Sequence, residues 1–135
     1  MSRDQKIIRI VAAVIRNPRG EVLLVRKRGT EAFMQPGGKL DAGETDLAAL
    51  DRELAEELGC RLRPGSVRDL GAFEAAAANE PGHTVQARLY EVAVDEEPRA
   101  QAEIAELAWV DPHATGDRVL APLTRACVLP LFVEG

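Results

Sequence analysis

The chain has 135 residues, of which 46% are hydrophobic and 29% are charged. This length suits a single domain, and the composition is that of a globular protein, not of a disordered or fibrous one. The formal net charge of −5 argues against general binding to nucleic-acid polymers.

The N-terminal segment carries no signal for a membrane or for export. The apolar run 7–15 is interrupted by Arg9 and is too short to span a membrane, and no small-residue cleavage site follows it. Cys60 and Cys127 lie in apolar stretches without the spacing of metal ligands, which favours free thiols. We therefore expect a cytoplasmic protein that has no membrane partner.

Two strands are predicted first, at 6–16 and 21–28, with the turn residues 17–20 between them. This spacing predicts a hairpin. Arg26, Lys27 and Arg28 close the second strand, and alternation points Lys27 to the face opposite the two arginines. We expect at least one of these cations to reach an anionic substrate.

A helix is predicted between Thr45 and Gly59. Thr45 is suited to the N-cap position, and Gly59 is suited to the left-handed position that ends a helix. One apolar stripe along this helix is expected to face the core, because its leucines recur at helical spacing: Leu47, Leu50, Leu54 and Leu58.

The other side of this helix carries three carboxylates. Glu53, Glu56 and Glu57 share one face, where like charges repel, and Arg52 is expected to relieve part of the repulsion through Glu56. One cation cannot neutralise three carboxylates, whereas Mg²⁺ or Mn²⁺ would, with water and phosphate as further ligands. For an E-x-x-E-E pattern taken alone, a solvated acidic face is the alternative and the commoner case.

Charge is unevenly distributed along the chain. Residues 1–39 hold nine Lys and Arg against three Asp and Glu, whereas residues 40–57 hold seven Asp and Glu and one Arg. If these segments fold against each other, a basic wall faces an acidic helix, as a phosphate substrate held through a metal ion requires. The alternative is two ordinary surfaces that never meet.

The remaining predicted elements are strands at 66–76, 83–94 and 104–110 and a final helix with apolar residues from Val119 to Leu131. The order of strands, helix, strands and helix lacks strict βαβ alternation. It predicts an α/β fold of the α+β type, a mixed sheet between helices, in one domain over residues 1–135.

The helix and the turn before it resemble the signature box of the Nudix hydrolase family. Gly38 is followed after five residues by Glu44, and after seven more by Arg52-Glu53-Leu54-Ala55-Glu56-Glu57-Leu58-Gly59. The box spans 38–60, and its one departure is Cys60, where the family has a bulky aliphatic residue. The resemblance implies the Nudix α/β/α sandwich and hydrolysis of a phosphoanhydride bond with Mg²⁺ or Mn²⁺.

The resemblance also implies roles for single residues. The expected metal ligands are Glu53, Glu56, Glu57, the Gly37 carbonyl and Glu103, with Glu106 and Glu97 as competitors of Glu103. The expected catalytic group is Glu53 as general base, oriented by Arg52 and supported by Glu44. The expected substrate-binding residues are Arg26, Lys39 and Gly38.

Markers of particular Nudix substrates are missing, because Ala75, Ala76 and Ala77 stand where some subfamilies carry Pro or Tyr. By elimination, the chain resembles a MutT-type enzyme that converts a nucleoside triphosphate, including one with an oxidised base, to a nucleoside monophosphate and pyrophosphate. The alternatives are ADP-ribose, nucleotide-sugar or dinucleoside polyphosphate hydrolysis, a non-catalytic nucleotide-binding Nudix module, and an isoprenoid diphosphate isomerase. By the same resemblance, Thr124 either contacts a base or only starts a helix, and a homodimer is compatible with the family.

Overall fold

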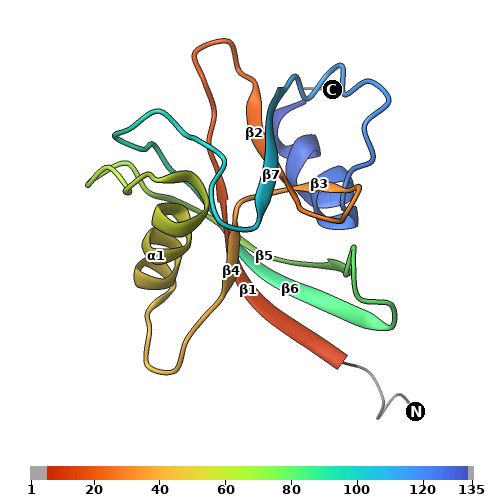
Figure 1. Ribbon diagram of the computed structural model, residues 1–135, viewed down its shortest axis with the longest axis horizontal. Helices are drawn as coiled ribbons and strands as arrows, with labels where there is room; N and C mark the ends of the chain where they lie inside the picture. The colour runs from red at the N-terminus through yellow and green to blue at the C-terminus, as the bar shows by residue number, and fades with distance from the viewer. Residues whose placement is uncertain (1–5, 134–135) are drawn as a thin grey trace.

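The computed structural model describes residues 6–133 (Figure 1). Its elements, in chain order, are β1 (Lys6–Val14), β2 (Val22–Lys27), β3 (Phe33–Met34), β4 (Gly37–Lys39), α1 (Asp46–Leu58), β5 (Arg68–Ala76), β6 (His83–Glu91), β7 (Ile104–Val110), a π-helical turn η1 (Thr124–Val128) and a 3-10 turn η2 (Leu129–Phe132). Within residues 6–133, no helix is long and apolar enough to cross a membrane.

The strands form two sheets where the sequence predicted one. The larger sheet has the order β4-β1-β6-β5, with β1 and β6 parallel and the other pairs antiparallel, and the smaller antiparallel sheet has the order β3-β2-β7. The predicted hairpin is limited to its base, where Arg16 pairs with Val22. Beyond this bridge β2 takes β7 as its partner, from Val22 opposite Val110 to Lys27 opposite Ile104.

Both faces of the central strands are buried. Along β1 and just beyond it, Val11, Ala13 and Ile15 join the core under α1, whereas Ala12 and Val14 join a second core under the C-terminal turns. Figure 1 shows α1 and the C-terminal turns on opposite sides of the strands. The α/β/α arrangement is therefore confirmed, and the apolar run 11–15 follows from burial on both sides.

Helix α1 has the predicted caps. Thr45 Oγ1 accepts a hydrogen bond from the Ala48 N–H at 3.1 Å, and Gly59 ends the helix with φ 69°. Leu50, Leu54 and Leu58 are fully buried, but Leu47 is 39% exposed. The prediction for Leu47 was wrong because the first helical turn extends past the edge of the core.

The final helix is more irregular than the periodicity predicted. Its helical residues run from 122 to 132, as two α-helical residues followed by the five-residue η1 and the four-residue η2, and Val119 lies outside them and is exposed. Pro130 has no backbone N–H to donate, so a regular α-helix cannot continue through it. Cys60 is buried and Cys127 is half-buried, and both are free thiols.

Candidate active site

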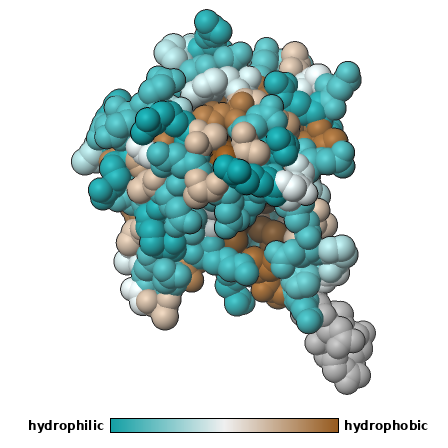
Figure 2. Space-filling view, in the orientation of Figure 1, coloured by the Kyte–Doolittle hydropathy of each residue, from teal (hydrophilic) through white to brown (hydrophobic). Residues whose placement is uncertain are grey.

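The acidic face of α1 borders a cavity of about 340 Å³. The cavity lies between this face, strands β1 and β4 and the loops that precede β6 and β7. Its charged wall comes from seven side chains: Lys27, Lys39, Glu53, Glu56, Glu57, Glu80 and Glu103. Figure 2 shows a hollow with hydrophobic residues at its floor over the region of β1 and β6, on an otherwise mostly hydrophilic face.

Glu57 is the most buried acid of this wall, at 7% exposure. Burial raises the pKa of its carboxyl to about 7, although the Gly37 N–H donates to Oε1 at 3.1 Å and opposes the shift. A Cβ atom at residue 37 would lie 2.2 Å from the Val11 carbonyl oxygen, and φ is 148°. Glycine at this position therefore lets β4 pair with β1 and hold Glu57.

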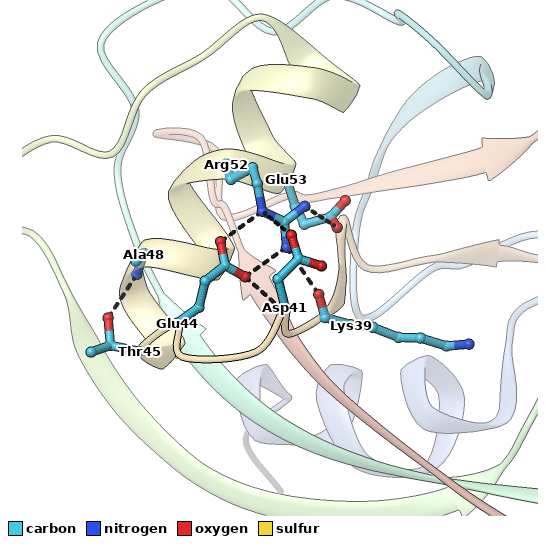
Figure 3. Close-up of polar contacts among 7 residues, drawn as sticks. All are labelled: Lys39, Asp41, Glu44, Thr45, Ala48, Arg52 and Glu53. Atoms are coloured by element: carbon cyan, nitrogen blue, oxygen red, sulfur yellow. Dashed lines mark hydrogen bonds and ion pairs between the residues drawn. The ribbon is translucent and has the colours of Figure 1, made fainter.

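Arg52 joins three parts of the site (Figure 3). Its Nε and Nη2 donate to the two carboxylate oxygens of Glu44 at 2.7 and 2.8 Å, its Nη1 donates to Glu53 Oε2 at 3.0 Å, and Nη2 also donates to the Lys39 carbonyl oxygen at 3.1 Å. The hydrogen bonds from Arg52 lower the pKa of Glu44 to about 2. The expected contact of Arg52 with Glu56 is replaced by these pairs, so Arg52 fixes the position of Glu53.

Glu53 is tightly enclosed. Burial raises the pKa of its carboxyl above the ordinary value, while Arg52 opposes the shift. A Cβ atom at Gly38 would lie 2.6 Å from the Glu53 carboxyl carbon. The structure therefore places Gly38 against the expected general base, where a side chain would displace it.

Arg26 does not reach the cavity, contrary to the sequence-based expectation. Its Nε donates to Glu106 Oε1 at 2.9 Å and its Nη1 to the Thr30 carbonyl oxygen at 2.8 Å, on the other face of β2. Lys27 lines the cavity in its place. The alternation along β2 placed the two residues on opposite faces, as predicted. The ion pair of Arg26 with Glu106 favours Lys27 as the phosphate contact, and which of the two binds substrate stays a prediction.

Glu103 lies in the cavity wall, as expected for an acid from outside the box. Its carbonyl oxygen accepts a hydrogen bond from the Arg28 N–H at 2.8 Å, which fixes the backbone just before β7. The preceding Ala102 has φ 54°, a left-handed conformation that is uncommon for alanine. The other competitor, Glu97, is not among the cavity residues.

The oxygen atoms of the cavity carboxylates are suitable ligands for a hard divalent cation, but the protein supplies only part of the coordination shell of such an ion. Among residues 6–133, no group of three or more Asp, Glu, His or Cys side chains is arranged to hold an ion by itself. Mg²⁺ keeps several waters and takes one or two carboxylates together with substrate phosphate oxygens. The carboxylates of the cavity therefore fit a metal ion that is shared with a substrate.

Gln35 was missed by the sequence analysis, whereas Thr124 was expected either to contact a base or only to start a helix. Gln35, between β3 and β4, and Thr124, at the start of η1, are both buried, and the Thr124 hydroxyl donates to Gln35 Oε1 at 2.7 Å. They are 89 positions apart, and a single glutamine before Pro36 gives no periodic signal. The pair becomes visible only when the fold brings the two segments together.

Known proteins with a similar sequence share this region. The NUDIX domain model matches residues 6–132. An 8-oxo-dGTP diphosphatase of Haemophilus influenzae is 48% identical over 60 residues, which are 42% of this chain and 44% of that protein. An RNA pyrophosphohydrolase of Halorhodospira halophila is 45% identical over 62 residues, which are 46% of this chain and 33% of that protein. The chain thus aligns with less than half the length of either relative.

The fold is also found in solved structures. A MutT Nudix hydrolase from Burkholderia pseudomallei superposes with a TM-score of 0.76 at 24% identity, covering 96% of this chain and 99% of that one. This likeness shows the fold. Together with the domain model, which spans nearly all of the described residues, it establishes that the chain belongs to the Nudix hydrolase family.

Proposed function

We propose that this Nudix hydrolase cleaves a phosphoanhydride bond of a nucleoside triphosphate, with Mg²⁺ or Mn²⁺ bound, and releases a nucleoside monophosphate and pyrophosphate. The observation that carries the proposal is the cavity, whose lining combines Glu53, Glu56 and Glu57 with Lys27 and Lys39. Such a wall combines oxygen ligands for a hard cation with positive charge for a polyphosphate.

The carboxylates of the cavity have two proposed roles, which are metal binding and proton transfer. Glu53, Glu56, Glu57, the Gly37 carbonyl and Glu103 are the donors that would be shared among one to three metal ions, each ion taking one or two carboxylates together with substrate phosphate oxygens. When bound, the ion would offset phosphate charge and make a water molecule more acidic.

Glu53 accepts the proton of the attacking water. Arg52 holds its Oε2 and Glu44 holds Arg52, so the carboxylate keeps one orientation. The water oxygen bonds to phosphorus while the bridging P–O bond breaks. Lys27 and Lys39 bind the phosphate oxygens, and this positioning supplies much of the catalysis expected in phosphoryl transfer.

The names of the relatives support a nucleotide substrate. One relative is an 8-oxo-dGTP diphosphatase, which suits a triphosphate with an oxidised base, and another is an RNA pyrophosphohydrolase. ADP-ribose, nucleotide sugars and dinucleoside polyphosphates are the alternative substrates. A non-catalytic module is disfavoured because every glutamate of the box is present and lines the cavity or supports Arg52. Homodimer formation and a cytoplasmic location stay predictions.

The test is a substrate screen with the purified chain in Mg²⁺ or Mn²⁺. It should include the deoxynucleoside triphosphates, 8-oxo-dGTP, ADP-ribose, a nucleotide sugar, a dinucleoside polyphosphate and a 5′-triphosphorylated RNA. We expect monophosphate and pyrophosphate from a triphosphate in a metal-dependent reaction. Release of a diphosphate and orthophosphate, or turnover of only another class, would overturn the substrate assignment.

A further inference from the structure

The backbone turn that brings Glu103 into the cavity wall has an unfavourable residue at its first central position. The turn spans residues 101–104, and the Ile104 N–H donates to the Gln101 carbonyl oxygen at 2.9 Å. Ala102 has φ 54°, whereas the φ of Glu103 is not positive. This combination is typical of a type II′ turn, in which glycine is favoured at the first central position. Alanine at this position therefore adopts a strained conformation.

Side-chain packing does not offset this strain. Ala102 and Glu103 both line the cavity and are both exposed. The methyl group of Ala102 therefore gains little from burial. A strained backbone conformation persists only where the surrounding structure fixes it, and such residues cluster at functional sites. The hydrogen bonds on either side of the turn show what fixes it here.

The segment before the turn caps the C-terminal end of α1. The last carbonyl groups of a helix have no partner within the helix. The Arg99 N–H donates to the Leu58 carbonyl oxygen at 3.0 Å, and the Gln101 N–H donates to the Glu57 carbonyl oxygen at 3.0 Å. The Gln101 side chain also lies over Gly59, where a Cβ atom would be 3.1 Å from its Nε2. Gln101 is thus fixed to the residue that supplies the most buried acid of the cavity.

The other end of the turn is fixed to β2 and to the core. The Glu103 carbonyl oxygen accepts a hydrogen bond from the N–H of Arg28, which directly follows β2, at 2.8 Å. Ile104 is 2% exposed and belongs to the core under α1. The chain must therefore change direction between Gln101 and Ile104, and the positive φ of Ala102 is part of this change.

We propose that Gln101 and Ala102 are positioning residues that hold the Glu103 carboxylate at a fixed place relative to Glu57, through the hydrogen bond to the end of α1 and the left-handed turn. This inference rests on the proposed function, because it concerns two of the carboxylates that would bind metal ions. Glu103 is exposed, so the turn and not packing determines where its side chain starts. A turn with a negative φ at residue 102 directs this side chain elsewhere.

The experiment measures the Kd of the full chain for Mn²⁺ without substrate, by electron paramagnetic resonance of the free ion. Ala102→Gly permits the positive φ and should leave the Kd within about twofold of the wild type. Ala102→Pro fixes φ at about −65° and so forbids the turn. We expect it to raise the Kd by about tenfold, as the loss of a residue that orients a ligand does.

A double-mutant cycle with Glu103→Gln separates positioning from general support of the fold. Glu103→Gln alone should raise the Kd by about tenfold, and adding Ala102→Pro should then raise it by no more than about twofold. Thermal unfolding shows whether each variant is folded. If Ala102→Pro does not fold, Ala102→Val carries the test, because a β-branched residue disfavours positive φ, and we expect a Kd raised by about threefold or more.

Equal affinities for Mn²⁺ in the wild type and in the folded Ala102→Pro or Ala102→Val variant would overturn the inference and leave the proposed metal site intact. The same loss of affinity with Glu103 and with Gln at position 103 would also overturn it, because the turn would then act without this carboxylate. If the wild type binds no Mn²⁺, or Glu103→Gln binds it equally well, the proposed metal role of Glu103 fails and the inference fails with it.

Discussion

Gly37 and Glu57 are joined by a hydrogen bond from the backbone N–H to carboxylate Oε1, at a position where a side chain on residue 37 would collide with β1. The Gly37→Ala substitution should therefore separate β4 from β1 and release Glu57. We expect a loss of more than about 2 kcal/mol in the free energy of unfolding and loss of hydrolysis, since overpacking and left-handed strain add. Chemical denaturation and an activity assay measure both effects.

Gly65→Ala is the matched control for this collision. Gly65 also has a positive φ, 81°, but a Cβ atom there would meet nothing within 4 Å. It should cost about 1 kcal/mol through backbone strain alone and leave hydrolysis intact. Equal losses in both variants would show that crowding against β1 is not the cause.

In the proposed mechanism Glu44 acts through Arg52, which holds Glu53, and it also accepts the Asp41 N–H at 2.7 Å. Glu44→Gln keeps the size of the side chain but removes the charge that orients the guanidinium. We expect kcat to fall by about tenfold or more while KM changes little, because the general base loses its orientation and the phosphate contacts remain. Steady-state kinetics at several metal concentrations measure the separate effects on kcat and KM. A pure KM effect would place Glu44 in substrate binding instead.

The raised pKa of Glu57 predicts how the metal-free protein responds to pH. The carboxyl titrates near its ordinary value when unfolded and at about 7 when folded. Between about pH 4.5 and 7 the unfolded chain loses its proton first, so stability should fall as pH rises, by on the order of 3 kcal/mol in all. Thermal unfolding in chelator across this window measures the slope.

Glu57→Gln should flatten this slope, because the amide does not titrate. Glu44 contributes in the opposite direction but at lower pH, since its lowered pKa removes stability only as pH falls from about 4.5 towards 2. Added Mg²⁺ should raise the stability of the wild type more than that of Glu57→Gln at pH 8. An unchanged slope in the variant would assign the effect to another group.

Lys27 and Arg26 are neighbours on β2, and we expect their substitution to affect KM differently. Lys27→Ala should raise KM for a triphosphate by about tenfold, because one cation facing the phosphates is lost. Arg26→Ala should leave KM unchanged and cost no more than about 1 kcal/mol of stability, because its pair with Glu106 is near the surface. Kinetics of the two variants side by side decide which residue contacts substrate.

The features of this fold that could be predicted from the sequence depend on residues that are close together in the chain. The caps Thr45 and Gly59 and the leucine period specify α1 within a single stretch, and Glu53 to Glu57 share a face because helix geometry demands it. The alternation along β2 separated Lys27 from Arg26 for the same reason. These signals depend on neighbours a few residues apart.

The parts that could not be read depend on distant segments. Which face of β2 meets α1 is decided by its pairing with β7, so the choice of Arg26 over Lys27 had no local basis. The exposure of Leu47 depends on where the core ends, and the Gln35–Thr124 pair joins residues from opposite ends of the domain. Periodicity also predicted a regular last helix, whereas this segment consists mostly of the π-helical η1 and the 3-10 η2, which contains Pro130.

The measurement that tests the central claim most directly is pyrophosphate release from a nucleoside triphosphate by the wild type and by Glu53→Gln, each titrated with Mg²⁺. We predict metal-dependent turnover in the wild type, and a kcat lower by about a hundredfold or more in a variant that stays folded, because in the proposed mechanism Glu53 takes the proton of the attacking water. Equal rates in the two proteins, or turnover that ignores Mg²⁺, would contradict it.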